Sequence, residues 1–357
     1  MVEVRDAQIS RAKEFLRRIS ESSGLSGYEY PIIPFLQERF ESLAQEIKLD
    51  RFGNMYALKR GTKGTYEVML AAHMDEIGLM AKEIDSRGFV RFTSVGGVDQ
   101  RTLLSQEVIV HGKKNLLGII GTMPPHLLQE DAMEKAVNIE DMGIDLGLSY
   151  DQIKEYVQVG DPITFKRKTL NLLNDVVAGK SLDDRAGIVV MAVCLEELAK
   201  LHHVHDVIAV ATTQEEVGVR GATTSAYNLN PDLALVIDVT HAATPDTKGQ
   251  VNLELGKGPS IALGPNIHPA IHKQLLETAV VERIPHQIEP IPGISGTDAW
   301  AIQVTQAGIP TGLVSIPLRY MHTSVETLDM QDVINAGKLL AYFIANLPDD
   351  LEGLLCY

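Results

Sequence analysis

The amino-acid sequence predicts an α/β protein in which helices cover a mixed sheet and a small β-rich segment interrupts the chain. Helical and strand patterns occur together in residues 1–75 and 169–357, whereas residues 76–168 contain short strands punctuated by glycine. The chain has 357 residues, more than a single hydrophobic core usually accommodates. We therefore expect a discontinuous α/β domain, residues 1–75 plus 169–357, and an inserted β domain, residues 76–168.

The first part of the chain opens with two predicted amphipathic helices. Apolar residues recur at helical spacing over residues 8–20 and 30–46. Two β-rich stretches follow, KLDRFGNMYALKR and YEVMLAAHMD. The second is a continuous apolar run, a pattern typical of strands that are buried on both faces of a sheet. It is therefore predicted to be a central strand.

The inserted segment has the pattern of a separate β domain. Five short strands are predicted there, at GLMAKEID, GFVRFTSVGG, EVIVHG, LLGIIGT and DPITFKR. Helical periods are few in this segment, and glycines separate the strands.

The last part of the chain returns to alternating helices and strands, which indicates helices on both faces of one sheet. Helices are predicted at residues 183–200, 268–282 and 328–347, and strands at 206–213, 232–240 and 311–317.

Composition excludes several classes of function. The chain carries 32 Lys and Arg against 47 Asp and Glu, a formal net charge of −15, which disfavours nucleic acid or an anionic membrane as partner. Its two cysteines are Cys194, in an apolar stretch, and Cys356, so we expect neither a disulfide framework nor a cysteine zinc site. The N-terminal segment lacks an apolar signal core, and no apolar run is long enough to span a bilayer. These features predict a cytoplasmic protein.

Candidate metal ligands follow the predicted strands. Three apolar strands end in side chains that can bind a cation, and a fourth leads into a loop that carries a histidine; these residues are His73 and Asp75, Glu215 and Glu216, Asp238, and His322. Ligands of an open α/β sheet lie beyond the carboxyl ends of its strands, so we expect the side chains to converge. Carboxylates buried together are costly unless a cation compensates, and this donor set suits zinc, cobalt or manganese.

Two adjacent aspartates, Asp183 and Asp184, stand just before an apolar helix in SLDDRAG. One carboxylate can cap the helix while the other faces the site, and the spacing leaves the assignment open. If Asp183, Glu216 and Asp238 are all ligands, they supply three negative charges. Two divalent ions would leave one positive charge for a bridging hydroxide, whereas a single ion would leave an excess of negative charge.

Other polar clusters have structural alternatives. His202, His203 and His205 follow a predicted helix, where histidines suit a helix C-terminus and a solvated turn better than a metal cluster. In GISGTDAW, Thr297 or Asp298 can cap a helix, or the loop can border the substrate site, and both alternatives stay open. The glycines of GKGPS and GVRGA do not fit a phosphate-binding loop.

Five motifs in order, AAHMDEIG, SLDDRAG, TQEEVGVRGA, VIDVTHA and YMHTSVE, resemble those of the TET-type, glutamyl/leucyl aminopeptidase-like enzymes. The similarity covers nearly the whole chain, including SVGGVDQ in the insertion. It implies a zinc-exopeptidase-like catalytic domain with an inserted small β domain that mediates dimer contacts. It also implies a homododecamer built from dimers, with active sites that face an internal cavity and trim peptides from the N-terminus.

The resemblance further implies a role for each site residue. One ion would be held by His73, Asp183 and Asp238, and the other by Asp183, Glu216 and His322. Asp75 would accept the second N–H of His73, and Glu215 would be the general base. Each subunit would thus bind two divalent ions, zinc or cobalt, and water activated between them would remove the N-terminal amino acid of a peptide.

Three rival functions are distinguishable. An aminoacylase-type amide hydrolase of the same metal-dependent superfamily would use the same ligands but require a blocked amine. A peptide-binding relative without catalysis would bind metal without turnover, although Glu215 argues against it. A polysaccharide hydrolase fits poorly, because Trp300 is the only tryptophan for stacking on sugars.

Overall fold

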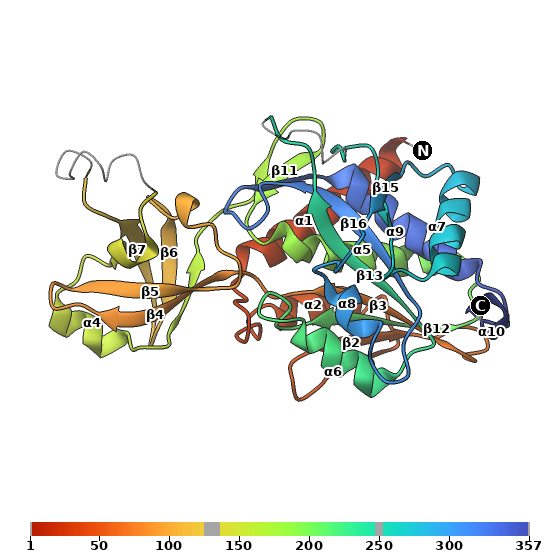
Figure 1. Ribbon diagram of the computed structural model, residues 1–357, viewed down its shortest axis with the longest axis horizontal. Coiled ribbons are helices and arrows are strands. Elements are labelled where there is room, and N and C mark those ends of the chain that lie inside the picture. Colours follow the sequence, from red (N-terminus) through yellow and green to blue (C-terminus); the bar gives the residue numbers. More distant parts are fainter. Residues whose placement is uncertain (1, 125–135, 246, 248–252, 356–357) are drawn as a thin grey trace.

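The computed structural model describes residues 2–124, 136–245, 247 and 253–355, and it consists of a large α/β part and a small β part side by side (Figure 1). Both described ends of the chain lie on the large part (Figure 1). Residues 125–135 of the predicted insertion, and Cys356, lie outside the described residues. The predicted fold class, a mixed α/β protein with an inserted β unit, is confirmed.

The large part is built on an 11-stranded mixed sheet, counted over the described residues. Its order is β1-β2-β12-β3-β13-β16-β17-β11-β10, and β14 and β15 join at β16. The central strands β12, β3, β13 and β16 are parallel to one another, whereas β12 pairs antiparallel with β2 and β16 with β17. The bounds are β1 (Glu46–Leu49), β2 (Met55–Lys59), β3 (Glu67–His73), β10 (Leu170–Asn171), β11 (Val176–Gly179), β12 (Asp206–Thr212), β13 (Leu233–His241), β14 (Ser260–Leu263), β15 (Gln287–Pro290), β16 (Thr311–Arg319) and β17 (Glu326–Asp329).

Both faces of this sheet are buried. Along β3, Leu70 and Ala72 belong to one hydrophobic cluster and Met69 and Ala71 to another, because successive side chains of a strand point to opposite faces. Helices α1 (Val2–Glu21), α2 (Ile33–Phe40), α5 (Leu182–Leu198), α7 (Pro269–Val281) and α9 (Met330–Ala345) contribute to the first cluster, and α6 (Arg220–Leu229) and α8 (Asp298–Ile302) to the second. The prediction of a strand buried on both sides is therefore confirmed.

The small part is a closed β-barrel in the order β4-β5-β8-β7-β6-β9. Its strands are β4 (Gly78–Ile84), β5 (Phe89–Val95), β6 (Glu107–His111), β7 (Asn115–Gly121), β8 (Gly143–Asp145) and β9 (Pro162–Phe165). Side chains such as Leu79, Phe92, Val108 and Ile163 fill a core that is separate from the clusters of the large sheet. All five strands predicted in the insertion are present.

Several predicted boundaries are wrong. The helix predicted over residues 30–46 is confined to α2, which has Pro34 in its first turn, and by Gln45 the chain has turned to pair with β2, where the Gln45 N–H donates to the Leu58 carbonyl. The helix predicted over residues 328–347 begins at Met330, since Asp329 ends β17 and its side chain accepts the Gln331 N–H as an N-cap.

Short elements also escaped prediction. Among them are β8, β10, β11, β14, β15, β17, α6, the final helix α10 (Glu352–Leu355) and α4 (Tyr150–Tyr156), which the Ser149 capping box starts within the insertion. Over the described residues, no helix combines the length and apolar character needed to cross a membrane.

Candidate active site

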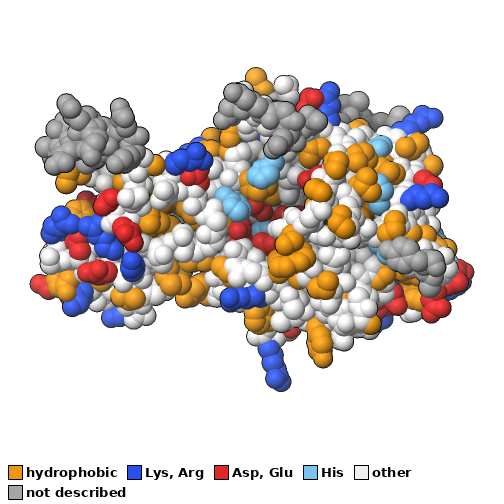
Figure 2. Space-filling model, viewed as in Figure 1, with side chains coloured by type: hydrophobic (Ala, Val, Ile, Leu, Met, Phe, Trp, Pro, Cys, Tyr) orange, Lys and Arg blue, Asp and Glu red, His pale blue; other side chains and the backbone are white. Residues whose placement is uncertain are grey.

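The parallel strands bring the candidate ligands to one edge of the large sheet. His73 is the last residue of β3 and pairs in register with Thr212, the last residue of β12, which the Glu215–Glu216 segment follows. Asp238 lies in β13, and His322 follows β16. Histidine and acidic side chains gather in a hollow near the middle of the face drawn in Figure 2. The expected convergence at the carboxyl ends of the strands is thus observed.

Two groups of potential ligands share one residue. In the described part of the chain, ligand atoms of His73, Asp183 and Asp238 lie within 4.8 Å of one another, and so do those of Asp183, Glu216 and His322. His73 Nε2 is 3.1 Å from Asp183 Oδ1, and His322 Nε2 is 3.3 Å from Asp183 Oδ2. All five residues predicted as ligands are therefore brought together, with Asp183 in the middle.

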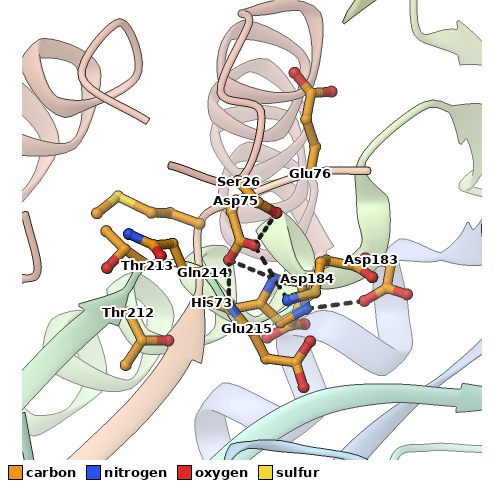
Figure 3. Close-up of polar contacts among 12 residues, drawn as sticks. Ser26, His73, Asp75, Glu76, Asp183, Asp184, Thr212, Thr213, Gln214 and Glu215 are labelled. Carbon is orange, nitrogen blue, oxygen red and sulfur yellow. Dashed lines mark hydrogen bonds and ion pairs between the residues drawn. The ribbon is translucent and has the colours of Figure 1, made fainter. Parts of the chain in front are cut away.

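Asp75 ties a candidate ligand to the loop that follows β12 (Figure 3). Its Oδ1 lies 3.5 Å from His73 Nδ1 and accepts the Glu215 N–H at 3.0 Å. Its Oδ2 accepts the Glu216 N–H at 3.2 Å and the Ser26 hydroxyl at 2.5 Å. One buried carboxylate therefore orients the His73 ring and holds the backbone of both glutamates.

His322 is oriented from the inserted barrel. Its Nδ1 lies 2.9 Å from the carbonyl oxygen of Gly97, so the ring donates there and turns Nε2 toward Asp183 and Glu216. Gly97 must lack a side chain, because a Cβ at that position would lie 2.7 Å from His322 Nδ1. The SVGGVDQ segment is thus part of the site's wall.

The charge of the cluster requires compensation. Burial raises the pKa of Glu215 to about 10 and, with the nearby Asp183 carboxylate, that of Glu216 to about 8. The hydrogen bond to Asp183 raises the pKa of His322 to about 9. Burial alone would lower the pKa of His73, but its contacts with Asp183 and Asp75 raise it.

The raised pKa values of Glu215 and Glu216 mark a cluster of buried carboxyl groups whose charged forms a cation would stabilise. Imidazole nitrogens and carboxylate oxygens, with no thiolate among them, form a donor set suited to zinc or cobalt. The residues present therefore fit a divalent metal centre.

The two adjacent aspartates have different environments. Asp184 is fully buried, and its Oδ1 accepts the Gly187 N–H at 3.0 Å; because the backbone of Asp183 and Asp184 is not helical, Asp184 caps the regular helix that follows it within α5. Asp183 faces His73 and His322 instead. The alternative left open by the sequence is resolved: Asp184 caps and Asp183 faces the candidate centre.

The GISGTDAW segment both caps a helix and borders the site. The Thr297 hydroxyl accepts the Ala299 N–H at the start of α8, and the buried Asp298 accepts the Thr212 hydroxyl at 2.5 Å. Ser295, Thr297 and Trp300 line the cleft next to the candidate ligands. Both predicted alternatives hold for this loop.

The cleft that contains the candidate ligands measures about 560 Å³. Glu215 lines it, and apolar side chains form part of its wall; these are Val219, Ile291, Ile294, Trp300, Leu313 and Met321. His202, His203 and His205 belong to neither group of potential ligands, but the predicted solvated turn is wrong for two of them, since His203 and His205 are buried and His205 Nε2 contacts the Pro348 carbonyl at 2.8 Å.

Two buried glutamates near the site were missed by the sequence analysis. Glu29 accepts the N–H groups of Gly27 and Gln214, and Glu326 accepts those of Leu182, Asp183 and His322. Glu326 lies four residues after His322 within YMHTSVE, so the motif itself carried a signal. Glu29 had none beyond its place in the loop after the first helix.

Comparison with known proteins identifies relatives over nearly the full length. The model of the M42 glutamyl aminopeptidase family matches residues 53–339. The lysyl aminopeptidase of Pyrococcus furiosus is 36% identical over 339 residues, 94% of this chain and 97% of the relative.

Two solved structures are also similar. A TET aminopeptidase from a Thaumarchaeota archaeon of marine sediment superposes with a TM-score of 0.91 at 32% identity, covering 97% of this chain and 98% of that one. The dodecamer of PhTET1-12s has a TM-score of 0.82 at 32% identity, covering 94% and 99%. The resemblance inferred from the motifs is confirmed.

Proposed function

The chain belongs to the M42 glutamyl aminopeptidase family, whose members are metal-dependent aminopeptidases, and from this premise we propose that each subunit works with two divalent ions, zinc or cobalt. His73, Asp183 and Asp238 would hold one ion, and Asp183, Glu216 and His322 the other. The observation that supports this most directly is the pair of ligand groups joined by Asp183. Their three carboxylates would offset most of the charge of two ions.

The residues of the chain divide the catalytic work. When bound, the ions supply Lewis acidity, which polarises the scissile carbonyl and lowers the pKa of water. Glu215 would take a proton from the attacking water at a carboxylate oxygen and later give it to the leaving amine. Its pKa, raised by burial in the metal-free cluster, would fall beside cations.

Contacts around the candidate centre hold the general base and a metal ligand in position. Asp75 accepts the backbone N–H of Glu215 and also lies next to His73, so it holds the base and one ligand as a unit. The apolar wall formed by Ile291, Trp300 and Leu313 would receive the first side chain of a peptide and exclude water from the reacting bond.

The function is tested with peptides that differ only at the N-terminus. Free-amine peptides should lose their first residue, and N-acetylated peptides should resist. Chelation should abolish the reaction, and zinc or cobalt should restore it. Cleavage confined to acetylated substrates would establish the aminoacylase alternative, metal binding without any turnover would establish a binding protein, and full turnover without metal would refute the two-ion mechanism.

We further propose a homododecamer built from dimers, with contacts between the inserted barrels; the PhTET1-12s structure that this chain resembles is a dodecamer. On the barrel's β7, Leu117 and Ile119 are 50% and 53% exposed, an apolar pair on the outer face. Light scattering should give a large assembly for the native chain and a smaller one for Leu117→Glu with Ile119→Glu. A monomeric native chain at working concentration would refute the assembly.

We place the enzyme in the cytoplasm. Cys194 is a free thiol buried in α5, which suits a reducing compartment. Retention of the protein in the soluble cytosolic fraction after cell lysis tests this placement, and recovery in an extracellular or membrane fraction would refute it.

A further inference from the structure

Glu326, the first residue of β17, joins the two segments that carry Asp183 and His322. Its Oε2 accepts the N–H of Leu182 at 2.7 Å and that of Asp183 at 3.2 Å. Its Oε1 accepts the N–H of His322 at 3.0 Å. The carboxylate is 1% exposed, so these hydrogen bonds are shielded from water. A single buried side chain therefore links the backbones of two candidate ligands that are far apart in sequence.

Neither of the two segments is held by a regular strand ladder. Ser181 and His322 both have left-handed backbone conformations, with φ of 56° and 61°. Residues without glycine's freedom keep such conformations only when surrounding contacts hold them. Glu326 supplies such contacts on both sides, and the Gly97 carbonyl supplies another to the ring of His322.

The two groups of candidate ligands depend differently on this link. His73 and Asp238 lie in β3 and β13, which are central strands of the sheet, so their positions do not require Glu326. The group of Asp183, Glu216 and His322 needs both ends of the link in place. Loss of the link would therefore loosen the second group more than the first.

We propose that Glu326 is a positioning residue that sets the separation of Asp183 and His322, and through it the affinity for the ion held with Glu216. The inference rests on the two-ion function proposed above and adds a residue to it that holds no ion itself. It assigns to the fold an unequal control: the ion site of Asp183, Glu216 and His322 depends on both ends of the Glu326 link, and the other site depends on the Asp183 end alone.

The test compares Glu326→Ala and Glu326→Gln with a matched control. Asp332 in α9 is also fully buried, and its two oxygens accept the N–H groups of Gly256 and Gly258, both at 2.7 Å, away from the candidate ligands. Asp332→Ala therefore removes a comparable buried carboxylate without affecting the centre. Each variant is dialysed against buffered free zinc, and the measurements are ions per subunit, zinc affinity, kcat, KM and thermal unfolding.

The expected result is a selective loss. Wild type and Asp332→Ala should bind two ions, and Glu326→Ala should bind one at the free zinc concentration that saturates the wild type. Affinity for the second ion should fall on the order of 10–100-fold, the usual effect of removing a partner outside the ligand set. kcat should recover at high zinc with KM little changed. Glu326→Gln keeps one acceptor oxygen, so its loss should be smaller, and it serves as the test if the alanine variant does not fold.

Three outcomes would overturn the positioning role: two ions of unchanged affinity in the Glu326 variants, an equal loss of both ions, or the same loss in Asp332→Ala. Failure of the underlying function is distinguishable, because then the wild type itself would bind fewer than two ions.

Discussion

Metal binding to the candidate centre is expected to compete with protons, so that affinity rises steeply with pH. Burial and the Asp183 carboxylate raise the pKa of Glu216 to about 8, and the hydrogen bond to Asp183 raises that of His322 to about 9. Both groups must lose their protons before they coordinate a cation. At neutral pH, an ion that binds with Asp183, Glu216 and His322 therefore displaces two protons.

The magnitude follows from the number of protons displaced. Each displaced proton changes the apparent association constant tenfold per pH unit, so below about pH 8 the constant should rise about 100-fold per unit. Between about pH 8 and pH 9 only His322 remains protonated, and the rise should fall to about tenfold per unit. Asp238 and His73, whose pKa values are also raised, should steepen the pH dependence at the other group.

The assay is competition for zinc between the protein and a chelating dye, calibrated with zinc alone at each pH. Glu216→Gln is the matched variant, because it keeps the size of the side chain but removes one titrating ligand. A plot of the logarithm of the apparent association constant against pH should have a slope that is smaller by one in this variant, because one proton fewer is displaced. An affinity that does not change with pH in the wild type, or an equal slope in the variant, would refute the reasoning.

Three further predictions concern residues of the candidate site. Glu215→Gln should keep both ions while kcat falls on the order of 10²–10⁴-fold, whereas Glu216→Gln should lose one ion and recover at high metal; the reverse pattern in metal content would swap their roles. Asp75→Asn disturbs the contact with His73 and the hydrogen bonds from the Glu215 and Glu216 N–H groups, so it should lower zinc affinity or activity on the order of 10–100-fold. The circular dichroism spectrum should stay unchanged, and activity equal to that of the wild type would contradict the positioning role of Asp75. In the metal-depleted protein, the pKa values of Glu215 and Glu216 lie above the ordinary 4.5 and that of His322 above 6.5, so the native state binds more protons than the unfolded state. The melting temperature of that protein should therefore fall as the pH rises from about 6 to 9. A melting temperature that rises over this range would contradict the prediction.

The central strands were predictable because burial on both faces leaves a continuous apolar run. β3 is such a run, and its residues alternate between two hydrophobic clusters. β1 (Glu46–Leu49) was predicted only from Lys48 onward, since none of its residues is fully buried, although Ile47 packs against the core and the strand pairs with β2. Periodicity reports burial, so a strand held mainly by backbone pairing leaves little trace in the sequence.

The candidate ligands were predictable for a related reason. His73 is the last residue of its strand, and Asp238 lies within one, so the direction of the parallel strands places both at the same edge of the sheet. The capping role of Asp184 was not predictable, because both members of the Asp183–Asp184 pair suit a helix start, and only the contact with the Gly187 N–H separates them.

Glu29 and Glu326 show where such inference ends. Each accepts a backbone N–H group from a segment remote in the sequence, and such a donor carries no residue identity, so even the presence of Glu326 in YMHTSVE does not reveal its partners. The ends of the strands thus determine which side chains meet. The carboxylates of Glu29 and Glu326 then fix the distances between the loops that carry those side chains. It follows that two chains with the same five candidate ligands can bind metal with different strength, and that the difference would reside in residues such as Glu326.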